Sequence, residues 1–335
     1  MIKKDLYLDG RSININTKPY LIAEIGLNHN KDIELTKKMI KKAKESGADA
    51  VKFQVYETEN LINEESDAFN IFKNLELTYE EIKTLKEYSD KIGITFFATP
   101  FSFKSVDLLE KLNVPFYKIA SMDINYYEFI KYIAEKEKPI ILSTGMSSLG
   151  EIEKAVNTII KTGNENIAIL HCISKYPPEY GDMNIRMITK LATLFSDYQI
   201  GFSDHTLDNS MAIVARTLGA TIFEKHFTLD KNLEGPDHKI SSTPEEFAHY
   251  RETLLNVDKS LNYISKERGD IFISQFARRS LFANCDIPKG TKITKEMIKI
   301  VRPGDGIAPE YLPLFIGKEV KKDIKKNQKI DISMI

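Results

Sequence analysis

Eight short segments rich in Ile, Val and Phe recur along this chain, separated by stretches with helical periodicity. They are YLIAEI (20–25), DAVKFQV (49–55), ITFFAT (94–99), FYKIAS (116–121), PIILST (139–144), NIAILHC (166–172), QIGFS (199–203) and ATIFEKH (220–226). The stretch DIELTKKMIKKAKESG (32–47) is typical of the intervening helices, because its apolar residues fall on one face and Gly47 follows them as a stop. Strands that are apolar on both faces and alternate with helices indicate parallel β/α units joined by right-handed crossovers. Eight such units in about 200 residues predict a (β/α)8 TIM barrel rather than an open doubly wound sheet.

The barrel pattern ends with a helical stretch near residues 243–261, and the chain then changes character. We expect the barrel domain over residues 1–263, a charged linker over 264–280 and a small β-rich domain over 281–335. The longest connection inside the barrel, residues 57–78, lies between the second and third strands and is either a lid or an inserted helical excursion.

The last segment contains an internal repeat. DIPKGTKITKEMI (286–298) aligns with DIKKNQKIDISMI (323–335), and seven of the thirteen aligned positions are identical. Gly290 aligns with Asn327, and both residue types tolerate positive φ, so each copy is predicted to be a turn between two short strands. A domain this small is near the lower size limit for independent stability. We therefore expect it to dock on the barrel or on a partner subunit.

Charge and hydropathy exclude several function classes. Lys and Arg total 47 against 48 for Asp and Glu, so the chain has no bias toward nucleic acid, and an anion site must be a local cluster. No apolar run approaches the ~18–20 residues of a membrane span, and the N-terminus has no signal-peptide core. Cys172 and Cys285 are too few and too far apart for a disulfide framework. These features predict a cytoplasmic enzyme with neither nucleic acid nor a membrane as its partner.

Polar side chains lie at the carboxyl ends of nearly all the predicted strands, where a barrel of this kind carries its active site. In chain order they are Glu24, Lys52, Gln54, Thr99, Lys118, Ser121, Asp123, Ser143, Ser174, Tyr176, Ser203, His205, Glu224 and His226. Lys52 and Gln54 alternate with Phe53, so both can point into the barrel. A single Ser or Thr at a strand end is most often only the N-cap of the next helix. The set as a whole is therefore what indicates a site.

His205 and His226 end adjacent predicted strands at the same height. Two imidazoles that converge on one rim can bind a divalent metal and leave positions open for a substrate oxygen and water. The alternative is a pair of structural, hydrogen-bonded histidines. We predict a metal site, which Mn²⁺, Mg²⁺ or Co²⁺ can share because all three accept open N/O coordination.

Lys52 and Lys118 lie inside otherwise apolar strands, although lysine is rarely buried without a partner. Three interpretations stay open: an ion pair with Glu24 or Asp123, an anionic ligand, or a Schiff base. Four hydroxyls lie at neighbouring strand ends: Thr99, Ser121, Ser143 and Ser203. Two cationic groups, four hydroxyls and a histidine pair favour a phosphorylated or carboxylated substrate over a Schiff base.

An ordered set of short motifs runs from about residue 18 to the end of the chain. The motifs are LIAEIGLNHN, DAVKFQ, ATPF, YKIAS, ILSTGM, GFSDHT, EKHFTLD, GPDH and the late RPG (302–304). With them the chain resembles the sialic acid synthase family, the phosphoenolpyruvate-dependent nonulosonate synthases, and its terminal repeat resembles their antifreeze-like (SAF) domain. The resemblance implies a transferase that condenses phosphoenolpyruvate with an open-chain N-acyl hexosamine and releases phosphate.

The resemblance also implies residue roles. His205 and His226 would hold a divalent metal, Mn²⁺ ahead of Mg²⁺ or Co²⁺, that polarises the sugar aldehyde. Glu24 and Asp123 would stabilise a cation or activate water. The residues implied to bind phosphoenolpyruvate are Lys52, Thr99, Lys118, Ser121, Ser143 and Ser203. The residues implied to contact the sugar are Gln54, Tyr176, Asp237 and Arg302, with Ser174 also in the substrate-binding set, and Arg302 would come from the other subunit of a domain-swapped homodimer.

The identity of the sugar stays open. N-acetylneuraminate synthases read KHQTH, Asn and GSGE where this chain has KFQVY (52–56), Ser174 and ASMD (120–123), whereas FARRSLFA (276–283) is closer to legionaminate and pseudaminate synthases. N-acetylmannosamine, a 2,4-diacetamido-6-deoxyhexose and a related bacillosamine-derived sugar are the alternatives. Rival classes are a metal-dependent aldolase-type enzyme and a carbohydrate-binding protein.

Overall fold

The computed structural model describes residues 5–261 and 271–335. The chain divides into two compact units, Met1–Asn262 and Tyr263–Ile335, each considered by itself below. The expected boundary at 263 and the first part of the expected linker, 264–270, lie outside the described residues. The rest of that linker contains two short helices, η4 (Ile271–Ile273) and α11 (Ser274–Ala277).

The eight apolar segments form a closed parallel barrel, which confirms the predicted fold class. The strand order is β10-β3-β4-β5-β6-β7-β8-β9, so neighbours in sequence are neighbours in the sheet and β10 closes against β3. The strands are β3 (Tyr20–Gly26), β4 (Ala50–Val55), β5 (Thr95–Pro100), β6 (Tyr117–Ile119), β7 (Ile140–Ser143), β8 (Ile167–Cys172), β9 (Gln199–Asp204) and β10 (Ile222–His226).

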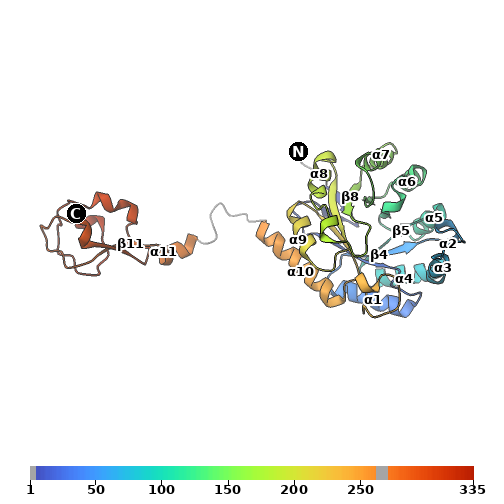
Figure 1. The fold of residues 1–335 in the computed structure, drawn as a ribbon, viewed down its shortest axis with the longest axis horizontal. Helices are drawn as coiled ribbons and strands as arrows, with labels where there is room; N and C mark the ends of the chain where they lie inside the picture. The colour runs from blue at the N-terminus through green and yellow to red at the C-terminus, as the bar shows by residue number, and fades with distance from the viewer. Residues whose placement is uncertain (1–4, 262–270) are drawn as a thin grey trace. The chain divides into compact units, whose positions relative to one another are not determined.

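Helices surround the strands (Figure 1). They are α1 (Ile33–Glu45), α4 (Tyr79–Ile92), α5 (Phe103–Lys111), α6 (Tyr127–Ala134), α7 (Leu149–Ile160), α8 (Met187–Leu194), α9 (Ser210–Thr217) and α10 (Pro244–Leu261), with the shorter α2 (Thr58–Leu61) and α3 (Phe69–Leu75) between β4 and α4. The sequence sets the ends of α1: the Asp32 side chain accepts from the backbone N–H of Leu35, and Gly47 follows with a φ of +88°.

A short N-terminal hairpin closes one end of the barrel. Its strands are β1 (Leu6–Leu8) and β2 (Arg11–Ile13), and their buried side chains belong to one apolar cluster with interior strand residues such as Ile22 and Phe97. Arg216, almost fully buried, ties this end together by donating to the carbonyls of Ile15 and Thr17. The amino ends of the strands are therefore filled with hydrocarbon, and the carboxyl ends are left for polar groups.

The second unit has an internal pseudo-two-fold arrangement built on the sequence repeat. Ile287 and Ile324, which occupy the same position in the two copies, exchange backbone hydrogen bonds of 2.8 and 2.9 Å. The Asp323 carboxylate accepts from the N–H of Lys289 at 2.8 Å, and Asp286 accepts from Lys326 at 2.7 Å. Each copy thus hydrogen-bonds to the other.

The prediction of two short strands in each copy is wrong. Gly290 and Asn327 do have positive φ, +84° and +70°, but their flanks pair through isolated bridges rather than strands. The only strands in the described part of this unit are β11 (Ser280–Ala283) and β12 (Ile298–Val301), which are antiparallel. After β11 its helices are 3-10 turns: η5 (Lys295–Met297), η6 (Pro309–Leu314) and η7 (Ile332–Met334).

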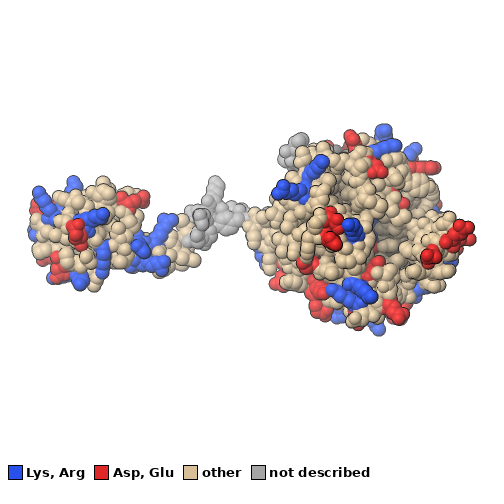
Figure 2. Space-filling model, in the orientation of Figure 1, with Lys and Arg blue, Asp and Glu red and all other residues tan. Residues whose placement is uncertain are grey.

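The surface carries charges of both signs. Figure 2 shows Lys and Arg interspersed with Asp and Glu over the visible face of each unit, as the nearly balanced composition predicts. Among the described helices, none combines the length and the apolar character that a membrane crossing requires.

Candidate active site

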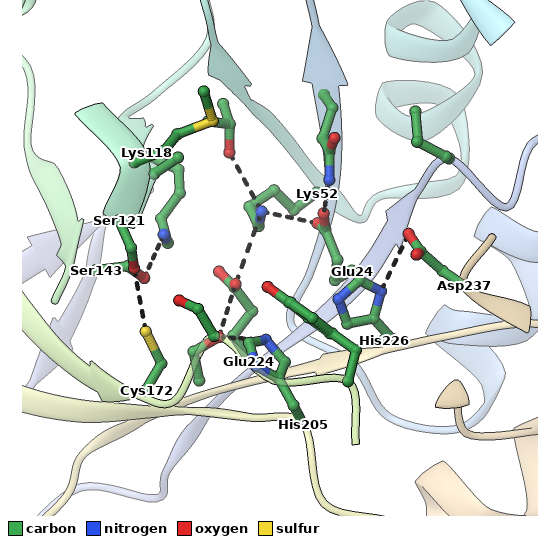
Figure 3. Close-up of a pocket in the computed structure, with 18 of the residues that line it drawn as sticks. Glu24, Lys52, Lys118, Ser121, Ser143, Cys172, His205, Glu224, His226 and Asp237 are labelled. Carbon is green, nitrogen blue, oxygen red and sulfur yellow. Dashed lines mark hydrogen bonds and ion pairs between the residues drawn. The ribbon is translucent and has the colours of Figure 1, made fainter. Parts of the chain in front are cut away.

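A cavity of about 440 Å³ opens at the carboxyl ends of the barrel strands, and Figure 3 shows its lining. The structure brings thirteen of the fifteen predicted site residues together around it. They are Glu24, Lys52, Gln54, Thr99, Lys118, Ser121, Ser143, Ser174, Tyr176, Ser203, His205, His226 and Asp237. The strand alternation explains the selection, because every second side chain near the end of a strand faces inward.

Lys52 lies between two carboxylates at the base of this cavity. Its ammonium is 2.9 Å from Glu24 Oε2 and 3.7 Å from Glu224 Oε1, and all three side chains are buried. Burial lowers the pKa of Lys52, but Glu224 and Glu24 outweigh burial and raise the pKa above its usual value. Lys52 is therefore an ammonium at neutral pH, and the ion-pair interpretation holds for it.

Lys118 is held differently. Its ammonium donates to the Ser143 hydroxyl and to the carbonyl of Ile119, and across the described residues no carboxylate oxygen lies within 4.0 Å of it. Burial is the largest influence on its pKa and lowers it. A buried ammonium without a counter-ion is costly. The arrangement is suited to an anionic ligand at this position.

Glu224 lines the cavity as well, although no role was predicted for it. It was recognisable only as one more polar residue at a strand end. Its carboxylate accepts from Ser203 Oγ at 3.1 Å and faces Lys52. Burial raises its pKa, but the Lys52 and Lys118 ammonium groups outweigh burial and lower it, so Glu224 is a carboxylate at neutral pH.

His205 and His226 extend from the ends of neighbouring strands, and their ring centroids are 5.6 Å apart. His205 Nδ1 is 2.8 Å from the carbonyl oxygen of Ile173. Because that oxygen can only accept, Nδ1 carries the proton and Nε2 carries a lone pair. His226 Nδ1 is buried without a hydrogen-bond partner and lies 3.7 Å from Asp237 Oδ2 (Figure 3).

Both rings are neutral at physiological pH. Burial is the first cause, and it lowers the pKa of each histidine to about 4. Neutral imidazoles with free lone pairs fit a divalent metal. In the part of the chain that the structure describes, no three or more His, Cys, Asp or Glu side chains form a metal-binding group. The two histidines would thus leave most coordination positions to substrate and water.

Backbone and small side chains at the ends of β6, β7 and β8 shape another part of the wall. The N–H of Gly145 donates to Ser121 Oγ at 2.9 Å and to Cys172 Sγ at 3.1 Å. A Cβ atom at position 145 would lie 2.3 Å from Ser174 Oγ and 2.9 Å from Cys172 Sγ, so a larger residue there would displace both of these side chains. Cys172 lines the cavity, although nothing in its sequence context distinguished it from a core cysteine.

The outer lining of the cavity is apolar. Seven side chains make it: Leu27, Leu61, Ile62, Phe72, Phe101, Met122 and Met146. The excursion over residues 57–78 supplies three of them, Leu61, Ile62 and Phe72. The Tyr56 hydroxyl donates to the carbonyl of Phe72 at 3.0 Å, which fixes that part of the excursion.

Two predicted site residues lie elsewhere. Asp123 is in η1 (Ser121–Asp123), half-buried and outside the cavity lining; its Oδ2 has no hydrogen-bond partner, and burial raises its pKa to about 6. Arg302 is in the second unit, where its side chain is exposed. The roles of both stay predictions. His171 does not line the cavity. It is buried, and its Nε2 is hydrogen-bonded to the carbonyl of Met183 at 2.8 Å.

Comparison with known proteins defines the class of this barrel. Residues 39–266 match the model of the NeuB family, and residues 278–335 match the SAF domain. The chain therefore belongs to the NeuB family, the sialic acid synthase family that its motifs resemble. The N,N'-diacetyllegionaminic acid synthase of Legionella pneumophila is 37% identical over 325 residues, which cover 91% of each chain.

Two further matches cover most of the chain. An uncharacterized protein of Methanocaldococcus jannaschii is 46% identical over 308 residues, 91% of this chain and 90% of its own. The crystal structure of the N-acetylneuraminic acid synthetase of Leptospira borgpetersenii superimposes with a TM-score of 0.76 at 36% identity, covering 79% of this chain and 93% of that one. Synthases of the sialic acid type are thus what this chain is similar to over most of its length.

Proposed function

We propose that this protein condenses phosphoenolpyruvate with an open-chain N-acyl hexosamine to give a nine-carbon sialic-acid-type sugar and phosphate. The observation that carries the proposal is the buried Lys118 ammonium, which has no carboxylate partner in the described chain and faces the same cavity as Lys52. Phosphoenolpyruvate supplies a phosphate and a carboxylate within three carbons. Two ammonium groups at the base of one cavity match that charge pattern.

The reaction breaks a C–O bond. The C3 carbon of phosphoenolpyruvate attacks the aldehyde carbon of the sugar, the aldehyde oxygen takes up a proton, and positive charge develops at C2. Water adds to C2, and the resulting tetrahedral carbon expels phosphate to leave a 2-keto acid. Glu24 lines the cavity and can stabilise the cation or accept the water proton, whereas Asp123 lies behind the lining and would act through a water molecule.

A divalent metal fits the neutral pair His205 and His226, with Mn²⁺ expected ahead of Mg²⁺ or Co²⁺. When bound, the metal supplies Lewis acidity to the aldehyde oxygen of the sugar. The histidines would hold it, and Asp237, whose Oδ2 lies 3.7 Å from His226 Nδ1 and so beyond hydrogen-bond distance, would contact a sugar hydroxyl beside the second ring.

For the acceptor, the apolar outer lining favours a 6-deoxyhexose such as a 2,4-diacetamido-6-deoxyhexose. A methyl group at C6 would contact hydrocarbon, and a C6 phosphate would find no partner, because Lys52 and Lys118 are the only Lys or Arg side chains among the described residues lining the cavity. One group of this size in an apolar site changes kcat/KM by about 10-fold or more. A 6-deoxy sugar should therefore be preferred to N-acetylmannosamine and to its 6-phosphate.

Phosphate release with phosphoenolpyruvate, Mn²⁺ and a panel of N-acyl hexosamines tests the reaction. Phosphoenolpyruvate labelled with ¹⁸O at the bridging oxygen should deliver the label to phosphate, whereas P–O cleavage would leave it in the product. Lys118→Met should lower kcat/KM by about 10²–10³-fold while the protein stays folded. Lys104→Met, which changes an exposed lysine, is the matched control.

Other outcomes would favour the rival classes. An aldolase would accept pyruvate in place of phosphoenolpyruvate and release no phosphate. A carbohydrate-binding protein would bind sugar and turn over none of the panel. For the acceptor, Ile62→Thr should reduce the preference for the 6-deoxy sugar, and Ile71→Thr, an exposed neighbour outside the lining, should not.

A further inference from the structure

Directly beneath the two histidines, β9 and β10 are joined by a buried ion pair. Asp204 and Lys225 are opposite each other in the strand register, and their charged groups are 3.2 Å apart with both side chains almost fully buried. Each is the residue immediately before a histidine: Asp204 precedes His205, and Lys225 precedes His226. The pair therefore connects the backbones that carry the two rings.

We propose that the Asp204–Lys225 pair is a positioning device that sets the separation of His205 and His226 for metal binding. The inference rests on the proposed metal site. Asp204 and Lys225 lie outside the cavity. They would affect metal affinity through His205 and His226, the residues that directly follow them.

Side-chain alternation excludes direct contact with substrate. Ser203 on β9, His205 directly after it, and Glu224 and His226 on β10 all line the cavity, whereas Asp204 and Lys225 do not. The two sets point to opposite faces of the sheet because successive strand side chains alternate. The ion pair lies toward the helices, where the Lys225 ammonium also sits 5.1 Å from the ring centroid of Tyr250.

The pair fixes the chain on both sides of His205. Asp204 Oδ1 accepts from the backbone N–H of Thr206 at 2.9 Å and from its hydroxyl at 2.7 Å. Lys225 Nζ donates to the Thr206 carbonyl at 2.7 Å. Three hydrogen bonds thus hold the residue after His205 to the two residues of the ion pair, and a shift of either strand would strain them.

The two histidines depend on this device unequally. The His205 ring has a bond of its own, from Nδ1 to the Ile173 carbonyl, whereas His226 Nδ1 has no hydrogen-bond partner. The position of the His226 ring is therefore set mainly by its backbone, which continues directly from Lys225. Groups that orient metal-binding histidines commonly alter metal affinity by about 10–100-fold when removed.

Stability alone is a weak reason for such a pair. Burying two charges costs about as much as their attraction returns, so an apolar pair of similar volume is often as stable. A charged pair with fixed partners does, however, define one register and one distance between strands. That is the property a two-residue metal site requires.

The test is metal affinity rather than activity. Asp204→Asn with Lys225→Met removes both charges together, so no unpaired charge is left buried. We expect the Kd for Mn²⁺, measured by electron paramagnetic resonance titration, to rise about 10–100-fold, with Tm little changed and phosphoenolpyruvate binding retained. Lys225→Arg keeps the ion pair and should recover most of the affinity.

The matched control is a buried ion pair with no residue in the cavity lining, Arg216–Asp258, which joins α9 to α10. Arg216→Met with Asp258→Asn should leave the Kd for Mn²⁺ unchanged even if Tm falls. Should the first double variant not fold, Asp204→Asn with Lys225→Gln, which also leaves no charge buried and keeps a donor for the Thr206 carbonyl, replaces it in the same titration.

An unchanged Kd for Mn²⁺ in the folded Asp204 and Lys225 variants would overturn the inference, as would equal losses in the control pair. Failure of the proposed function looks different: wild-type protein would bind Mn²⁺ but release no phosphate with any acceptor. A wild-type protein that binds no divalent metal would overturn the inference together with the metal part of the proposed function.

Discussion

The Lys52 ammonium lies 2.9 Å from the Glu24 carboxylate, and both side chains are almost fully buried at the base of the cavity. Removing the cation leaves Glu24 and Glu224 buried close together with nothing between them. We predict that Lys52→Met abolishes turnover and destabilises the protein by about 3–5 kcal/mol, the usual cost of breaking a buried pair.

A second substitution separates the two effects. Glu24→Gln in the Lys52→Met background removes one of the two carboxylates that have lost Lys52, and Lys118 still acts on Glu224, so Tm should recover in part while turnover stays absent. Thermal unfolding and phosphate release on the same preparations measure both. Wild-type turnover in Lys52→Met would contradict the assigned site.

Metal binding should persist to unusually low pH for a histidine site. Burial lowers the pKa of His205 and His226 to about 4 from the ordinary 6.5, so protons do not compete for the imidazole lone pairs until the pH approaches 4–5. Mn²⁺ titrations at pH 7.5, 6.5 and 5.5 should give similar affinities. An affinity for Mn²⁺ that falls with a midpoint near pH 6.5 would show that the two imidazole rings are exposed to water.

The same shifts predict how the stability of the metal-free protein depends on pH. His29, also buried, has its pKa lowered to about 4 by desolvation. Between pH 6.5 and 4 the unfolded chain binds more protons at these three histidines than the folded chain does, so stability should decrease as the pH falls through this window. Urea midpoints measured across it give the slope. Asp123, whose pKa is raised to about 6, acts in the opposite sense, so the profile is measured in Asp123→Asn, where a flat result would contradict the burial of the rings.

Cys172 should report occupancy of the cavity. Its thiol lines the cavity, whereas Cys285 is exposed in the second unit. In Cys285→Ser, iodoacetamide should label Cys172 slowly, and saturating phosphoenolpyruvate should slow the labelling further. Wild-type protein supplies the comparison, since labelling of Cys285 should be fast and indifferent to phosphoenolpyruvate. Equal labelling of Cys172 with and without the ligand would place phosphoenolpyruvate elsewhere.

Asn28 should affect the acceptor and not phosphoenolpyruvate. Its buried amide donates to the carbonyl of Phe227 and to the hydroxyl of Ser241, which in turn donates to the Asp237 carbonyl at 2.6 Å. Asn28→Asp replaces that donor with a carboxylate and loosens the loop that carries Asp237. We expect the KM for the sugar to rise several-fold with the KM for phosphoenolpyruvate unchanged. A parallel rise in both constants would indicate a general loss of structure.

The barrel could be predicted because its strands are buried on both faces. Each strand is therefore a continuous apolar run in the sequence. All eight appear within a few residues of their predicted bounds. The N-terminal hairpin was not predictable in the same way: β1 and β2 have three residues each, and their order depends on contacts with Ile22 and Phe97 far along the chain.

At the site, residue types were predictable and distances were not. Alternation identified Lys52 and Lys118 equally, and only the folded structure shows that one has carboxylate neighbours and the other does not. Asp123 follows its strand closely in sequence, yet its side chain lies behind the cavity lining, because a 3-10 turn redirects the chain after Ala120.

The terminal repeat was visible in the sequence, but its pairing was not, because each copy finds its partner in the other copy. Ile287 and Ile324 exchange backbone hydrogen bonds, and Asp286 and Asp323 each accept from a backbone N–H of the other copy, that of Lys326 and of Lys289 respectively. Residues 286–298 and 323–335 therefore form two halves of one structure, and each half satisfies the backbone hydrogen bonds of the other. A chain that ended before residue 323 would lack the hydrogen-bond partners of residues 286–298. The two copies therefore depend on each other for folding.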